Sequence, residues 1–66
     1  MVRSRLTIVL KETGIRITQV INSSRLARET VFRAKKDSLI GSCTLDTLGA
    51  IAKALGVKIK DLFEED

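Results

Sequence analysis

The fold is decided by the stretch Thr44-Leu45-Asp46-Thr47-Leu48-Gly49-Ala50-Ile51-Ala52-Lys53-Ala54-Leu55-Gly56-Val57. Its apolar residues recur at helical spacing and form one stripe, made by Leu45, Leu48, Ile51, Ala52 and Leu55. Thr44 is a good N-cap, Asp46 suits the positive end of a helix dipole, and Gly56 is a natural helix end. The stretch therefore predicts a capped helix that packs one face against a core.

Two shorter helices are expected on the N-terminal side. Residues 2–13 carry apolar side chains at spacings of three and four and stop at Gly14, which favours a helix over the rival strand across residues 6–10. A second helix runs to Ser24, either from Ile17 with Arg16 at the cap position or after Thr18 as the cap. Val20 and Ile21 would enter the core, and Arg25 would belong to a turn.

The remaining segments complete an expected all-α domain of five short helices over residues 1–66. After Leu26 enters the core, Ala27–Lys36 forms a helix, and residues 37–43 form a loop in which Leu39 and Ile40 fold back on the core. A last short helix, Ile59–Glu64, turns Leu62 and Phe63 inward, and residues 64–66 are a solvated acidic end.

Composition excludes several classes of function. Sixty-six residues make one small domain with too little chain for both a core and an enzyme cleft. No histidine is present, and Cys43 is the one cysteine, so we expect no zinc site, no internal disulfide and no nucleophile–histidine pair. Cys43 is expected to be a small buried residue. We predict neither an enzyme nor a cofactor.

Targeting signals are also lacking. No apolar run approaches the roughly 18 residues that a membrane span needs, and the first residues do not resemble a signal peptide. The sequence thus predicts a cytoplasmic protein with no membrane partner.

Charge is distributed unevenly along the chain. Residues 1–37 hold nine Lys or Arg against three acidic residues, a net +6, whereas residues 38–66 hold three Lys against five acidic residues, a net −2. A basic half and an acidic tail indicate one side that faces an anion.

The segment 26–36 concentrates this basic character on one face. On a helical wheel Ala27, Val31 and Ala34 share one side, and the opposite side holds Glu29, Phe32, Arg33 and Lys36, with Arg28 and Lys35 at the boundary. Ten residues of helix are roughly 15 Å long, which suits insertion into a major groove by one end.

These segments together resemble the Cro/repressor-type helix-turn-helix family, also called XRE or lambda repressor-like. The stretch 44–57, followed by Asp61-Leu62-Phe63, looks like that family's most specific helix and its closing segment. Upstream, Arg5-Leu6 and Lys11-Glu12-Thr13-Gly14-Ile15 are similar to the family's first helix and its exit. The resemblance covers nearly the whole chain.

The helix pair itself departs from the family pattern at four positions. Arg16 and Ile17 stand where Thr or Ser and then Gln usually open the second helix, so we expect Arg16 to supply the phosphate contact. Arg25 replaces the turn glycine, which implies either a positive φ or a different turn. Ala27 replaces the cap serine, at a cost of about 1 kcal/mol.

By position, the resemblance implies that four residues of the third helix contact base edges: Arg28, Glu29, Phe32 and Arg33. It also places Lys36 near the DNA backbone, and as basic residues at a helix end Lys35 and Lys36 are expected to contact phosphates. With Arg16, Arg25 completes the set of expected DNA-binding residues. Arginine can bind guanine in a bidentate way, glutamate can accept from cytosine N4, and phenylalanine can meet a thymine methyl. Two alternatives stay open. Glu29 could pair with Arg25 or Arg33, and Phe32 could cover residues 39–40 or sit in a dimer contact.

The resemblance implies a sequence-specific regulator of transcription that binds double-stranded DNA, most simply a repressor and most simply as a homodimer. One alternative is the antitoxin of a toxin–antitoxin pair, which would have a small protein partner. The other is a protein-interaction module that kept the fold and lost DNA binding, an idea that the four atypical positions keep open.

Overall fold

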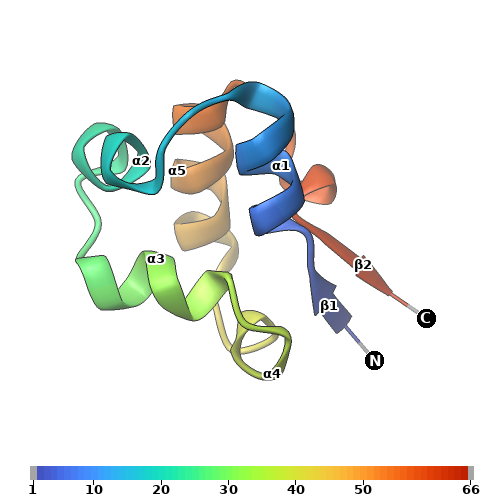
Figure 1. Ribbon diagram of the computed structural model, residues 1–66. Coiled ribbons are helices and arrows are strands. Elements are labelled where there is room, and N and C mark those ends of the chain that lie inside the picture. The colour runs from blue at the N-terminus through green and yellow to red at the C-terminus, as the bar shows by residue number, and fades with distance from the viewer. Residues whose placement is uncertain (1, 66) are drawn as a thin grey trace.

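A computed structural model describes residues 2–65 (Figure 1). It confirms a mainly helical fold with five helices and adds a small sheet formed by the two ends of the chain. The elements in chain order are β1 Val2–Ser4, α1 Leu6–Thr13, α2 Ile17–Ser24, α3 Arg28–Ala34, α4 Asp37–Ile40, α5 Leu45–Leu55, the 3-10 turn η1 Ile59–Asp61, and β2 Phe63–Glu65. No helix in residues 2–65 is long and apolar enough to cross a membrane.

Helix α5 is the element against which the others pack. It begins as predicted, with the Thr47 backbone N–H donating to the Thr44 hydroxyl over 3.1 Å, and it ends at Gly56 with a φ of 72°. Its inner face is buried along Leu48, Ile51, Ala52 and Leu55. The core around it is completed by Leu6, Val9, Val20, Val31, Ala34, Ile40 and Leu62.

Leu45, predicted as part of the buried stripe, is instead 71% exposed. It is the first residue of α5 and lines an apolar hollow of about 150 Å³. Helical spacing places Leu45 on the correct face of α5. Spacing alone cannot show that the elements packed against α5 do not reach its first turn.

The two ends of the chain were predicted incorrectly. The first helix begins at Leu6 rather than at residue 2, and the predicted helix Ile59–Glu64 is one 3-10 turn followed by a strand. Strands β1 and β2 pair antiparallel, and Arg3 stands opposite Glu64, a favourable cross-strand pair of charges. Each strand needs the other, so local periodicity in either segment cannot reveal the pairing. Glu64 and Glu65 are exposed as predicted, and Asp66 lies outside the described residues.

Ser4 ties the N-terminal strand to the end of α3. Its hydroxyl donates to the Ala34 carbonyl oxygen over 2.6 Å and accepts from the Leu6 backbone N–H over 3.2 Å. The Ser4 backbone N–H donates to the Asp37 carboxylate over 2.8 Å. These bonds fix the C-terminal end of α3 and the start of α4 relative to the sheet.

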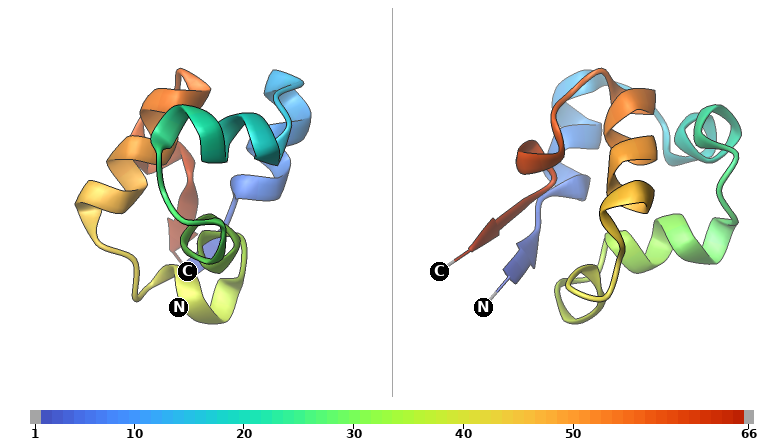
Figure 2. Two further views of the ribbon diagram at one scale, coloured as in Figure 1. Left: turned by 90° about the vertical axis from the view of Figure 1, so that its left-hand side faces the viewer. Right: turned by 180° about the vertical axis from the view of Figure 1, so that it is seen from behind.

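The segment 37–43, predicted as a loop, contains the four-residue helix α4. Ile40 enters the core with 2% of its side chain exposed, as expected, but Leu39 remains 37% exposed. Adjacent residues on a helix face different directions, so only one of the two can reach the core. In two views α3 and α4 lie near the N-terminal end of α5 (Figures 1 and 2).

Candidate nucleic-acid interface

Helix α2 begins at Ile17 with Arg16 at the cap position, which confirms one of the two predicted starts. Arg16 has an extended backbone, and its N–H donates to the Gln19 side-chain oxygen over 2.8 Å. This is half of a capping box. The other half would need a side-chain acceptor at Arg16, and arginine has none. The guanidinium group of Arg16 takes no part in the cap, and the residue is exposed to solvent.

The turn between α2 and α3 keeps its geometry without glycine. Arg25 adopts φ 59° and ψ 21°, and among residues 2–65 it is the one non-glycine residue with a positive φ. This confirms the first of the two turn alternatives. Its N–H donates to the Ile21 carbonyl oxygen over 3.1 Å, and the Leu26 N–H donates to the Ser24 hydroxyl over 3.3 Å. An arginine in this conformation is strained by about 1–2 kcal/mol. Leu26 then packs against the core, as predicted.

Helix α3 is shorter than predicted and spans Arg28–Ala34 instead of 27–36. At its end the Lys35 N–H donates to the Phe32 carbonyl and the Lys36 N–H to the Arg33 carbonyl, which is the tighter 3-10 pattern. Lys36 is extended because it is the cap residue of α4. The helix is therefore roughly 10 Å long, and Lys35 and Lys36 lie in the turn after it.

Helix α3 has one buried and one exposed face, as the helical wheel predicts. Val31 and Ala34 are 0% and 1% exposed and anchor the helix to the core. The exposed residues are Arg28, Glu29, Phe32 and Arg33. Figure 2 (left) views the molecule from the side on which α2, the turn and α3 lie. The helix thus presents a mixed, mainly basic face on a rigid support.

Phe32 is 38% exposed and has neighbours on two sides. The Lys35 ammonium lies 5.4 Å from the centre of its ring, a cation–π distance. It also shares a depression of about 270 Å³ with Leu39, and the other lining residues are Glu29, Arg33 and Lys36. We call this the α3–α4 depression. Of the three predicted uses of Phe32, the structure supports its packing near residues 39–40, but the ring stays accessible.

Leu39 lies beside Phe32 in this candidate interface, although the sequence did not place it among the DNA-binding residues. Its pattern suggested burial, and although one alternative for Phe32 placed it over residues 39–40, the exposure of Leu39 depends on α4, which was not predicted. Within residues 2–65, Glu29 makes no ion pair with Arg25 or Arg33, so the alternative of an intramolecular pair is not supported. Cys43, expected to be buried, is half-buried, with its sulfur 3.9 Å from the Leu39 carbonyl oxygen.

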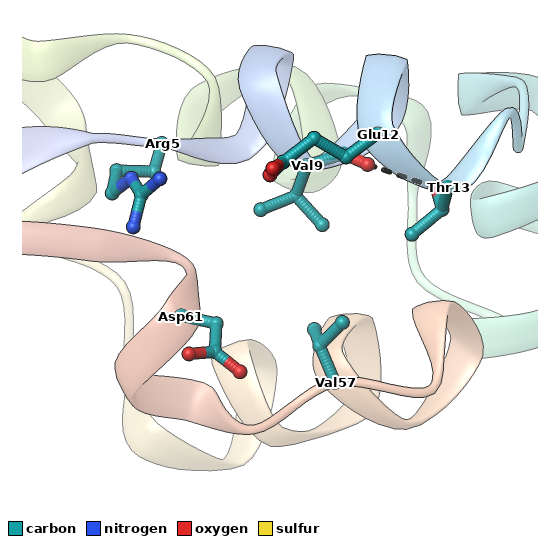
Figure 3. A pocket seen from close by; sticks show the side chains of 6 residues that line it. All are labelled: Arg5, Val9, Glu12, Thr13, Val57 and Asp61. Atoms are coloured by element: carbon teal, nitrogen blue, oxygen red, sulfur yellow. Dashed lines mark hydrogen bonds between the residues drawn. The ribbon is translucent and has the colours of Figure 1, made fainter.

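A second depression lies on another part of the molecule (Figure 3). It measures about 370 Å³ between α1 and the segment around η1, and it is lined by Arg5, Val9, Glu12, Thr13, Val57 and Asp61. None of the predicted DNA-binding residues lines it. In the part of the chain that the structure describes, no group of three or more His, Cys, Asp or Glu side chains could hold a metal ion.

Two helices joined by a tight turn, the second anchored by one face and exposing the other, define a helix-turn-helix domain. The family model described as the Cro/C1-type HTH DNA-binding domain matches residues 5–65, and the chain belongs to that family. Comparison with individual curated proteins and with solved structures finds no match. Family membership confirms the resemblance seen in the sequence and makes the chain a DNA-binding domain of the regulatory type.

The atypical cap of α3 gives a first prediction. Ala27 has the extended backbone of an N-cap, with φ −65° and ψ 148°, but no side-chain oxygen to accept from the first turn. We expect Ala27→Ser to raise the free energy of unfolding by about 0.5–1 kcal/mol, measured by urea denaturation. Ala54→Ser, the same change inside α5, is the control and should give no gain, because no free N–H faces it. Equal effects of the two changes would contradict the assigned cap.

Proposed function

We propose that this protein is a sequence-specific regulator of transcription, most simply a repressor, that acts in the cytoplasm by occupying its DNA site. Helix α3 would enter the major groove. The observation that carries the proposal is the outer face of α3. There Arg28, Glu29 and Arg33 are exposed side by side, while Val31 and Ala34 hold the helix rigidly from behind.

Each exposed side chain has a chemically suitable base edge. Arg28 and Arg33 can each donate two hydrogen bonds to guanine O6 and N7, and Glu29 can accept from the N4 amino group of cytosine. Phe32 offers an apolar contact to a pyrimidine methyl. A side chain without an internal ion pair, such as Glu29, is available for such a contact.

Cations around α3 would position the helix on the sugar–phosphate backbone. Arg16 precedes α2, Arg25 lies in the turn, and Lys35 and Lys36 follow α3, so the four frame the base-reading face at both ends. Contacts of this kind fix register and add affinity without reading sequence. Arg16 would replace the phosphate contact that polar residues at this position make in the family.

The turn geometry supports an intact helix pair in spite of the atypical residues. The four atypical positions weaken the family pattern in sequence, yet Arg25 adopts the positive φ and Ala27 the extended cap conformation that the helix pair requires. A protein-interaction module with the same fold would share this geometry, and it would differ by enriching no motif from a pool of random duplexes. An antitoxin would differ by co-purifying with a small partner.

A homodimer is the assembly we propose, through the start of α5. Leu45 is 71% exposed and lines one side of an apolar hollow, whose other lining residues are Val2, Ile40, Gly41, Cys43, Leu48 and Phe63. A projecting leucine next to a hollow is self-complementary across a two-fold axis, because each copy can offer its leucine to the other's hollow. The patch is small, so the dimer would be weak in the absence of DNA.

Selection from a pool of random duplexes tests the proposed function. We expect one enriched motif, with two half-sites about one helical turn apart if the protein binds as a dimer, and a matching dimer mass with the selected DNA. Affinity for that duplex should fall steeply with salt, with a slope of about −0.9 per neutralised phosphate. A pool without an enriched motif, or an affinity that salt barely changes, would contradict the proposal.

A further inference from the structure

The α3–α4 depression combines an apolar wall with a charged rim on the face assigned to DNA. Phe32 and Leu39 are two of the four large exposed hydrophobic residues in residues 2–65, and both line this one depression. Arg33 and Lys36 contribute two positive charges to the same lining, and Glu29 contributes one negative charge. Two exposed apolar side chains brought together from separate helices indicate a binding surface more strongly than either would alone.

The depression is also held in place. Phe32 follows the buried Val31 on α3, and Leu39 precedes the buried Ile40 on α4. The junction between the helices is fixed by Ser4, which bonds to the Ala34 carbonyl and to the Asp37 carboxylate. The Lys35 ammonium lies 5.4 Å from the centre of the Phe32 ring and restrains its position. Little side-chain entropy would be lost on binding here.

The chemistry of the lining matches one base edge best. In the major groove thymine shows a C5-methyl group next to the O4 acceptor, whereas cytosine shows the N4 donor next to a C5 that carries no methyl. An apolar wall with arginine and lysine donors at its rim suits a methyl group beside an acceptor. Glu29 accepts hydrogen bonds and would disfavour O4, but it belongs to the first turn of α3, with Arg33 one turn further along.

The geometry points to the α3–α4 depression as a pyrimidine-methyl site, in which Phe32 and Leu39 contact the C5-methyl of one thymine in each bound half-site. This inference rests on the proposed function and deepens it, because it assigns a base to one specific surface. Leu39, which lies outside the helix-turn-helix, becomes a specificity-determining residue.

The inference can be tested in the selected duplex by replacing thymine with deoxyuridine, one position at a time. The change removes only the methyl group and leaves O4 and base pairing intact. We expect one position per half-site at which wild-type affinity falls about fourfold, the factor for burial of a single methyl or methylene group. Phe32→Ala should bind the thymine and uracil duplexes equally at that position, and Leu39→Ala should reduce the ratio between them.

Ile8→Ala is the matched control, because Ile8 is 47% exposed on α1 and does not line the depression. It should keep the fourfold ratio, and thermal unfolding should show all variants folded. If no position responds to uracil, or if Phe32→Ala responds as the wild type does, the inference is overturned while duplex binding stands. If the protein binds no duplex at all, the proposed function itself fails, and the two failures are thus distinguishable.

Discussion

Ile51→Ala is expected to lower the free energy of unfolding by about 2–5 kcal/mol, the range for truncating a large aliphatic side chain in a packed core. Ile51 is 0% exposed and lies at the middle of α5, where α2, α3 and η1 all pack. A domain of 66 residues has a total stability of about 3–10 kcal/mol. The single change should therefore leave the protein marginally folded or unfolded at room temperature, measured by urea denaturation followed by circular dichroism.

Leu45→Ala is the control on the same helix. Sequence periodicity places Leu45 and Ile51 in one stripe, but Leu45 is 71% exposed, so its truncation should cost less than about 1 kcal/mol at low protein concentration. Similar losses for the two variants would show that the start of α5 is buried. That result would contradict the described packing.

The helix α5 could be predicted from sequence because its signals are local. A threonine cap, an acidic first turn, a stripe at helical spacing and a terminal glycine all lie within residues 44–56, and the structure contains each of them except the burial of Leu45. The helix pair was harder to predict, because the start of α2 at Ile17 and the positive φ of Arg25 were each one of two alternatives that the sequence left open. The cap position at Ala27 followed from the family pattern.

The sheet and α4 could not be predicted in the same way. Strands β1 and β2 have three residues each and pair residues about 60 positions apart, so neither segment carries a signal of its own. Helix α4 is four residues long and is held by the bond between Ser4 and Asp37. Both elements depend on long-range contacts, and the absence of α4 from the prediction is why Leu39 was expected to be buried.

Arg33→Ala is the change expected to affect DNA binding most. Arg33 is exposed on α3, one turn after Glu29, and its removal leaves the buried face of the helix intact. Loss of a bidentate contact to guanine should cost about 1–3 kcal/mol, or roughly 5–150-fold in affinity, and should relax preference at one base pair. Lys36→Ala would remove the proposed phosphate contact and should weaken binding to every sequence by a similar factor.

The central claim is that the outer face of α3 reads base edges in the major groove. Its most direct test compares wild type, Arg33→Ala and Lys36→Ala on the selected duplex and on its single-base-pair variants, at one salt concentration. We predict that Arg33→Ala equalises the affinities at one position, whereas Lys36→Ala lowers all affinities and keeps their order. Unchanged affinity and unchanged sequence preference in Arg33→Ala would contradict the assignment of this helix to base recognition.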